Sequence, residues 1–208
     1  MNIIILNGSP RKNGKISTLL HYIEEKLTEN GNSVEFIDVC SAGVKPCTGC
    51  MACRSKEKCV LPEDDGHKIA ESIKNCDGII IGTPVYWGNM NGQLKCLFDR
   101  LVGVLMGESK YGIPLPLQKG KKAAVITACT TPFPFNILAH QSTGAERALK
   151  EILKSSGFKI CSKIALSGTK AKTHFPARAL KKAEKCANKF RREQYQGRGC
   201  LPLGENQR

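Results

Sequence analysis

The stretch NIIILNGSPRKNGKISTLL, residues 2–20, joins a short apolar run to a helical pattern through a polar loop. Asn2–Asn7 has the composition of a buried strand and is far too short to span a membrane. From Ile16 onward, apolar residues recur at helical spacing, at positions 16, 19, 20, 23 and 27, and Asn30-Gly31 favours a helix end. The start of the chain therefore predicts a strand, a loop and a helix.

The same alternation continues along the chain. Further strands are expected at Ser33–Val39, 78–83, Lys122–Cys129 and Lys159–Leu166, and further helices after Asp64-Asp65, over 94–105, at Ala145–Ser156 and from Pro176 as first helical residue. Five strands alternating with five helices predict a three-layer, doubly wound α/β domain with a five-stranded parallel sheet. We expect one domain over residues 1–194, a cysteine-rich insertion at 45–63 and an irregular tail at 195–208.

Length and composition fit one soluble domain. The 208 residues are 41% hydrophobic, and neither a signal peptide nor a membrane-spanning run is recognisable, so we expect a cytoplasmic protein without membrane contact. The net charge of +14 comes from residues 119–208, which hold 19 Lys and Arg against 5 Asp and Glu. The densest part, Arg178–Arg192, has helical spacing and one aromatic residue, Phe190, so we do not expect nucleic-acid binding. Attraction of anionic nucleotides and a plain solvated face stay open as alternatives.

Ligands of such sheets bind beyond the carboxyl ends of the strands, where the strand order reverses. The loop after the first strand, Asn7–Thr18, offers hydroxyls, cations that include Arg11 and Lys15, and a helix N-terminus, which together can cradle a phosphate. It is not the P-loop of nucleotide triphosphatases, because five residues lie between Gly8 and Gly14 where the P-loop has four, and Ile16 follows Lys15 where a hydroxyl is needed. The alternative is an ordinary polar turn capped by Ser or Thr.

Two further loops belong to the same edge. After the third strand, Tyr86 and Trp87 precede Gly88 and Asn89, a combination suited to a flat ring approached by backbone N–H groups. The alternative is that the two aromatic side chains only plug the edge of the sheet. The loop after the fourth strand, 127–136, carries hydroxyls and prolines and would form a third wall.

Together, NGSPRKNGKIST (7–18) and PVYWGNMNGQLKCLFDR (84–100) resemble the flavodoxin-like NAD(P)H-dependent FMN reductases, and the resemblance covers roughly residues 1–165. It implies an FMN-dependent oxidoreductase. The phosphate contacts would be Ser9, Arg11, Ser17 and Thr18, with Lys15 nearby; the ring and ribityl contacts would be Pro84, Val85, Tyr86, Trp87, Gly88 and Asn89; the third loop would contribute Thr130 and Thr131. The sequence GKIST departs from the compact Gly-Asn-Ser/Thr of many members.

The segment KPCTGCMACRSKEKCVLPEDD, residues 45–65, is similar to the four-cysteine motif of the iron–sulfur flavoproteins within this family. The similarity implies a [4Fe–4S] cluster on Cys47, Cys50, Cys53 and Cys59, whose spacing can supply four iron ligands. A zinc site and a clusterless loop that shapes the rim of the flavin site are the alternatives. Seven further cysteines are scattered singly: Cys40, Cys76, Cys96, Cys129, Cys161, Cys186 and Cys200. Those at strand or helix positions are expected to act as small buried apolar residues.

The resemblance implies that electrons pass from NAD(P)H or a ferredoxin-like donor through FMN to an acceptor. Flavin chemistry of this kind demands no general base, and we name no catalytic side chain. A homodimer or homotetramer is implied by the resemblance. The alternative function is a non-enzymatic flavodoxin-like carrier or redox sensor that uses the cysteine loop.

Overall fold

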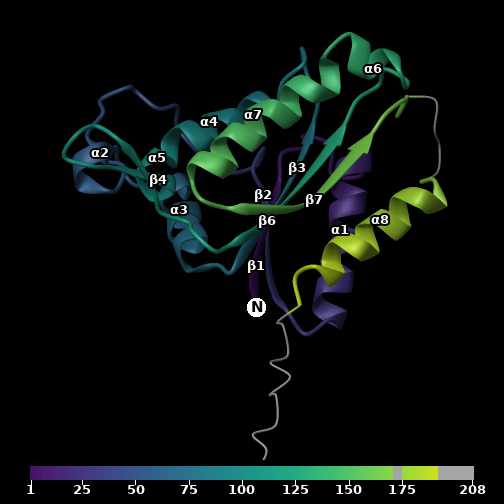
Figure 1. Cartoon of the computed structure of the whole chain (residues 1–208), viewed down its shortest axis with the longest axis horizontal. Coiled ribbons are helices and arrows are strands. Elements are labelled where there is room, and N and C mark those ends of the chain that lie inside the picture. The colour runs from purple at the N-terminus through teal and green to yellow at the C-terminus, as the bar shows by residue number, and fades with distance from the viewer. Residues whose placement is uncertain (171–174, 192–208) are drawn as a thin grey trace, which may run out of the picture.

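The computed structural model describes residues 1–170 and 175–191 (Figure 1). Five parallel strands form one sheet in the order β2-β1-β3-β6-β7. They are β1 (Asn2–Asn7), β2 (Ser33–Asp38), β3 (Gly78–Pro84), β6 (Lys122–Ala128) and β7 (Lys159–Leu166). The predicted doubly wound parallel sheet is confirmed, and its strand order reverses between β1 and β3.

Helices cover both faces of the sheet (Figure 1). On one face lie α1 (Lys15–Glu29) and α8 (Ala177–Asn188). On the other lie α3 (Asp65–Asn75), α4 (Gly92–Arg100) and α7 (Gln141–Ser155). Alternate residues of β1 feed the two cores, Ile3 and Ile5 packing toward α1 and Ile4 and Leu6 toward α4, because strand side chains point to opposite faces in turn.

Several local elements differ from the expectation. The helix expected over 94–105 divides into α4 and α5 (Val102–Leu105), since the chain turns at Leu101. A hairpin of β4 (Met106–Glu108) and β5 (Pro114–Pro116) follows, and two short helices occur in loops, α2 (Cys53–Lys56) and α6 (Phe135–Leu138). Pro176 is the N-cap of α8 instead of its first residue. The elements α2, α5, α6, β4 and β5 span only three or four residues each, too few to show a period in the sequence.

The expected tail over 195–208, and with it the boundary at residue 194, lies outside the described residues. Within the described part of the chain, no helix combines the length and the apolar character that crossing a membrane requires. Cys76, Cys129 and Cys186 are buried, as expected for small apolar residues, and burial raises the pKa of the Cys186 thiol to about 11. Cys40, Cys96 and Cys161 are half-buried, and Cys200 is not described.

Candidate functional site

The three predicted loops meet at the carboxyl ends of β1, β3 and β6. The Gly8 N–H donates to the Gly82 carbonyl at 2.8 Å, and the Val85 N–H donates to the Ala128 carbonyl at 2.8 Å. A Cβ on Gly8 would lie 3.0 Å from that Gly82 oxygen, so only glycine allows the first loop to approach β3 this closely. The structure thus brings the predicted walls of one site together.

The buried side chain of Asn7 organises the first loop. Its Nδ2 donates to the Ser17 Oγ at 3.0 Å and to an Asp38 oxygen at 2.7 Å, while its Oδ1 accepts the Ser9 N–H at 3.1 Å. The Ser17 hydroxyl in turn donates to the Arg11 carbonyl at 2.7 Å. The loop is therefore held in shape by its own hydrogen bonds. Sequence reasoning missed Asn7, although a polar residue at the end of a buried strand is a usable signal.

The first loop leads into the open N-terminus of α1. The N-cap is Gly14, and among the described residues no side chain caps this helix, so the predicted alternative of a Ser- or Thr-capped turn does not occur. The N–H groups of a helix's first turn, together with the positive end of the helix dipole, favour an anion. Thr18 is exposed one residue after the buried Ser17, and the Lys15 Nζ lies 4.9 Å from the centre of the Phe175 ring, toward α8.

The second loop is a tight turn that carries two exposed aromatic side chains. Tyr86 and Asn89 exchange two backbone hydrogen bonds of 2.9 Å, and between them Trp87 (φ 50°) and Gly88 (φ 72°) are left-handed. A left-handed conformation costs a residue other than glycine about 1–2 kcal/mol. Trp87 is fully exposed, at 105% of its reference area, and so does not plug the edge of the sheet. Strain and exposure at a ligand edge favour a binding role.

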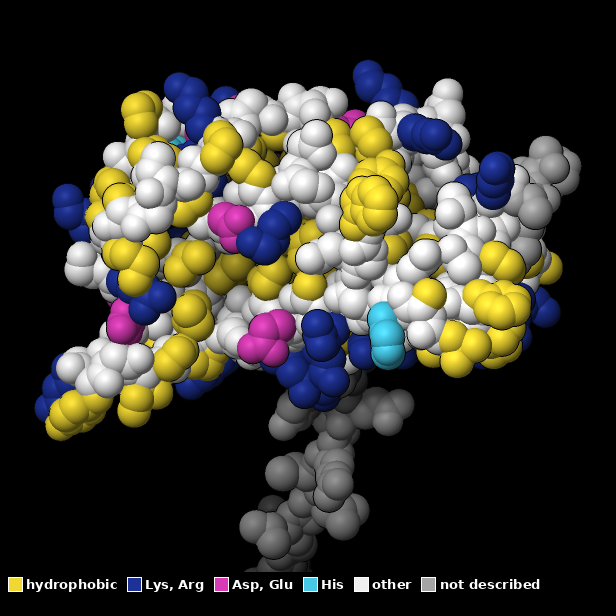
Figure 2. Space-filling view, turned by 90° about the horizontal axis from the view of Figure 1, so that it is seen from above, with side chains coloured by type: hydrophobic (Ala, Val, Ile, Leu, Met, Phe, Trp, Pro, Cys, Tyr) yellow, Lys and Arg dark blue, Asp and Glu magenta, His cyan; other side chains and the backbone are white. Residues whose placement is uncertain are grey.

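The turn rests on the start of α7. A Cβ on Gly144 would lie only 2.2 Å from the Gly88 carbonyl oxygen, which makes glycine a requirement of this contact. The third loop reaches the same helix, because the Thr131 hydroxyl donates to the Gln141 Oε1 at 2.5 Å, while Thr130 is exposed beside it. Viewed from above, this side of the molecule shows groups of hydrophobic side chains with Lys and Arg between them (Figure 2).

Replacing Gly144 with alanine is expected to lower FMN affinity about tenfold or more, because the overlap with Gly88 must displace the turn. The measurement is equilibrium FMN binding. The matched control is Gly107→Ala in the hairpin. Its new Cβ would meet Leu117 at an ordinary 3.5 Å, so the FMN affinity should stay unchanged. If the FMN affinity of the Gly144 variant is unchanged, the turn at 86–89 is not part of the binding site.

The cysteine insertion leaves the sheet beside the first two loops. The Cys40 Sγ, just beyond β2, donates to the Gly8 carbonyl at 3.5 Å and lies 3.9 Å from the Asn91 Oδ1 that caps α4. Farther along the insertion, a Cβ on Gly103 of α5 would lie 3.0 Å from the Cys53 Cβ, so this part of the loop packs tightly on α5.

Three thiols of this insertion, those of Cys47, Cys50 and Cys59, lie within electrostatic range of the fourth, that of Cys53. Cys47 and Cys50 are exposed, and Cys53 and Cys59 are half-buried. Burial raises the pKa of Cys53, and Cys47, Cys50 and Cys59 raise it further by charge repulsion. Across the described residues, no three His, Cys, Asp or Glu side chains converge closely enough to hold one metal ion. Four cysteine thiolates are the ligand set of a [4Fe–4S] cluster, in which each iron takes one of them, and they are also the ligand set of some structural zinc sites. The residue types therefore fit a cluster.

Arg100 forms hydrogen bonds with residues near both ends of the insertion. Sequence reasoning assigned it no role. Its Nε donates to the Cys59 Sγ at 3.1 Å and its Nη1 to the Lys45 carbonyl at 2.7 Å. The same guanidinium pairs with both carboxylate oxygens of Asp64 at 2.7 and 3.2 Å. The Arg100 and Asp64 side chains are only 1% and 6% exposed. Burial raises the pKa of Asp64, but hydrogen bonds from Arg100 and from the Lys45 N–H outweigh it and lower that pKa to about 2.

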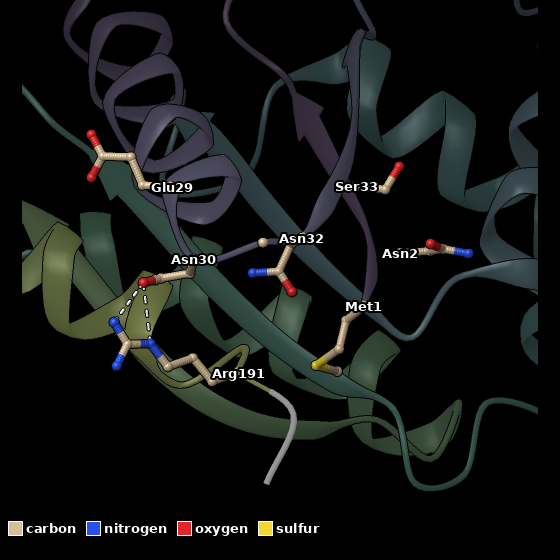
Figure 3. A pocket seen from close by; sticks show the side chains of 8 residues that line it. Met1, Asn2, Glu29, Asn30, Asn32, Ser33 and Arg191 are labelled. Carbon is tan, nitrogen blue, oxygen red and sulfur yellow. Dashed lines mark hydrogen bonds between the residues drawn. The ribbon is translucent and has the colours of Figure 1, made fainter. Parts of the chain in front are cut away.

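A separate cavity opens at the other end of the sheet (Figure 3). It is lined by the start of β1 and the end of α1, and there Arg191 donates to the Asn30 Oδ1 at 3.1 and 2.6 Å. Because this is the amino end of the strands, with the negative end of the α1 dipole and Glu29 beside it, it lacks the features of the ligand edge.

Comparison with known proteins agrees with this geometry. An iron–sulfur flavoprotein of Methanocaldococcus jannaschii is 39% identical over 100 residues, covering 48% of this chain and 51% of the relative. An iron–sulfur flavoprotein of Methanosarcina thermophila is 39% identical over 102 residues, covering 49% and 53%. An FMN reductase (NADPH) of Escherichia coli is 33% identical over 132 residues, covering 62% and 61%. The chain thus matches about half the length of its iron–sulfur relatives.

Solved structures share the fold. An azoreductase from Bacillus anthracis superposes with a TM-score of 0.72 at 17% identity, covering 91% of this chain and all of that one. An NAD(P)H:quinone oxidoreductase from Methanothermobacter marburgensis gives 0.67 at 19% identity, covering 90% and 94%. The profile of the family described as NADPH-dependent FMN reductase matches residues 1–153, nearly three quarters of the sequence. The chain belongs to the NADPH-dependent FMN reductase family.

Proposed function

We propose that this protein is an FMN-dependent oxidoreductase that moves electrons from NAD(P)H or a ferredoxin-like donor through FMN to an acceptor. The observation that carries the proposal is the meeting of the three loops at the carboxyl ends of β1, β3 and β6. Their content suits FMN: an uncapped helix N-terminus for the phosphate, a strained turn for the ring, and hydroxyls on the third side.

When bound, FMN supplies the hydride and electron chemistry, and the chain supplies binding and orientation. The α1 N-terminus would hold the phosphate with Ser9, Arg11, Ser17, Thr18 and Lys15. Backbone groups of Pro84, Val85, Gly88 and Asn89 would contact the ring and ribityl chain, with Tyr86 and Trp87 beside them. Thr130 and Thr131 would close the third side. Ser9 and Ser17 already bond within the loop, so they would serve by presenting backbone N–H groups as much as by their hydroxyls.

We also propose a [4Fe–4S] cluster on Cys47, Cys50, Cys53 and Cys59. The helix α4 joins the two centres, because Asn91 caps it beside the flavin turn and Arg100 ends it beside Cys59. Gly92 and Arg100 lie about 12 Å apart along the helix axis at 1.5 Å per residue. A one-electron centre fixed to the same rigid element as the flavin site suits a ferredoxin-like donor.

Titration of the protein with FMN is expected to quench the fluorescence of Trp87 with one FMN per chain. Trp87 is the only tryptophan in the sequence and stands free on the ring turn, so its emission reports this loop alone. Trp87→Phe is the control: it removes the protein signal and keeps an aromatic ring, and FMN binding is then followed by the emission of the flavin itself. Failure of FMN to bind either protein would overturn the proposed function.

Oxidation of NAD(P)H separates the enzyme from a non-enzymatic carrier or sensor. The FMN-loaded enzyme is expected to turn over NAD(P)H in the steady state with a quinone or ferricyanide as acceptor, whereas a carrier would show almost no turnover.

The contents of iron, acid-labile sulfide and FMN, measured on protein purified without oxygen, show whether the cysteine loop holds a cluster. About four irons and four sulfides beside one FMN support it, and FMN without iron makes the cysteines a structural rim.

We further propose that the protein forms a homodimer or homotetramer. The helix α6 exposes Phe135, Ile137 and Leu138 in one short segment, at 62%, 45% and 70%, which is unusual for a surface that stays in water. Sedimentation equilibrium of the FMN-loaded protein is expected to give two or four chains per particle. A monomer at micromolar concentration would exclude both assemblies.

A further inference from the structure

A second cavity, of about 610 Å³, lies between the carboxyl end of β7 and the start of α8. Its apolar walls include Phe133 and Phe175, and its polar walls include Thr169 and three cations, Lys15, Arg178 and Lys182. Its volume falls within the range of small-molecule sites. The residues assigned to FMN lie elsewhere, except that Lys15 stands between the two sites.

The charged side chains that the structure describes around this cavity are all cations. Among the described residues of its lining there are three Lys or Arg and no Asp or Glu. By contrast, the cavity at the amino end of the sheet includes Glu29, and the cavity beside the cysteine loop includes four carboxylates. The N-cap of α8 is Pro176, which also lines the cavity, and the first turn of α8 holds no acidic residue. The helix dipole therefore adds to the positive potential. An anion is the complementary ligand.

Arg178 and Lys182 both line this cavity. They are four residues apart on α8, a spacing that places their side chains on one face of the helix. A guanidinium and an ammonium at this distance can bind a phosphate from two sides. The aromatic rings of Phe133 and Phe175 offer flat apolar surface for a base.

The cavity wall is continuous with the flavin site. The Gly168 N–H donates to the Thr131 carbonyl at 3.0 Å, and both the N–H and the hydroxyl of Thr169 donate to the Cys129 carbonyl at 3.1 and 3.0 Å. The segment 167–169 thus lines the cavity and also supports the third FMN loop. A ligand bound here would lie next to the flavin site without occupying it.

We propose that this cavity binds a nucleoside phosphate, with Arg178 and Lys182 on the phosphate and the phenylalanine rings beside the base. Two sources share this chemistry: the adenosine phosphate half of NAD(P)H, which rests on the proposed function, and a free nucleotide. The basic excess of residues 119–208 then has a specific use at this cavity, since Arg178 and Lys182 belong to it.

The test is calorimetric titration of FMN-saturated protein with adenosine 2′,5′-bisphosphate, with adenosine 5′-monophosphate, and with adenosine and inorganic phosphate separately. One of the two nucleotides is expected to bind, and more tightly than either fragment. The double variant Arg178→Gln/Lys182→Gln is expected to lower its affinity about tenfold or more, since charge-assisted bonds are lost. The matched control Lys181→Gln/Lys185→Gln makes the same charge change on the same helix outside the cavity and should leave affinity unchanged.

Equal weakening in both double variants, or no nucleotide binding to the wild type, would overturn the proposal. Competition by NADPH assigns the cavity to the reductant, and binding without competition assigns it to a free nucleotide; both support the site. FMN binding, measured in the same samples through Trp87 fluorescence, is independent of these variants. Absence of nucleotide binding to wild-type protein that binds FMN therefore overturns the cavity proposal alone, and absence of FMN binding to the wild type overturns the proposed function.

Discussion

Replacing Arg100 with glutamine is expected to lower the free energy of unfolding by about 3–5 kcal/mol, since removing one partner leaves a buried charge uncompensated. The Asp64 carboxylate would stay buried without its guanidinium, and the Lys45 carbonyl and the Cys59 thiol would lose a donor. The measurement is urea unfolding at pH 7. The matched control on the same helix is Lys95→Gln, which breaks the half-exposed pair with Asp99 and should cost at most about 0.5 kcal/mol.

The pH dependence of the free energy of unfolding shows whether Asp64 causes the loss of stability in Arg100→Gln. Its pKa is lowered to about 2 in the folded protein from an ordinary 3.8, so the stability it contributes is present above the ordinary pKa and is lost as the pH falls through 2. Without Arg100, burial dominates and the carboxyl protonates at a higher pH. The gap in stability between the wild type and Arg100→Gln should therefore be full above about pH 5 and narrow toward pH 2. A gap that is constant with pH would contradict this role of the Arg100–Asp64 pair.

If Arg100→Gln does not fold, Arg100→Lys gives the same information with a smaller loss. Lysine keeps the charge beside Asp64 but cannot form the planar two-oxygen pair and also reach Cys59 and Lys45. Its free energy of unfolding should be lower than that of the wild type and higher than the value expected for Arg100→Gln. A lysine variant as stable as the wild type would show that charge alone holds the loop.

The sheet could be predicted from the sequence because its strands are continuous apolar runs. GIIIG at 78–82 and KAAVITA at 122–128 are buried on both faces, which few other structures explain. The hairpin of β4 and β5 could not be predicted, because its three-residue strands show no alternation and one begins and ends in proline. Its position depends on contacts with segments distant in the sequence, such as the Arg54 Nη1 donating to the Glu108 Oε2 at 3.1 Å.

The ligand edge could be located from the alternation of strands and helices along the sequence, but the side chains that support it could not. Asn7 and Arg100 each act through partners distant in sequence, Asp38 in one case and Cys59 with Asp64 in the other. No local pattern shows which buried polar side chain will meet which loop. The strained Trp87 is similar: the sequence shows two adjacent aromatic residues, and only the backbone shows that one of them is left-handed and free of packing.

Replacing Cys53 with alanine is expected to abolish iron binding while FMN stays bound, because one of four proposed cluster ligands is lost. Alanine keeps the Cβ that packs against α5 at Gly103, so the loop should keep its place. The measurement is iron, sulfide and FMN per chain after anaerobic purification. The matched control is Cys161→Ala in β7, a half-buried thiol outside the insertion that donates to the Ala123 carbonyl at 3.3 Å. Full iron content in the Cys53 variant would rule out the proposed ligand set.

The same Cys53→Ala variant tests the route by which electrons reach the proposed FMN, either through the cluster or directly from NAD(P)H. A one-electron donor such as reduced bacterial ferredoxin would reach the flavin through a cluster, whereas NAD(P)H delivers a hydride directly to the flavin. Cys53→Ala should therefore lose FMN reduction by ferredoxin and keep NAD(P)H oxidation at the wild-type rate. Loss of both activities with FMN still bound would show that the cysteine loop shapes the flavin site itself. Retention of both would mean that ferredoxin reduces the exposed flavin edge at Trp87 without help from the insertion.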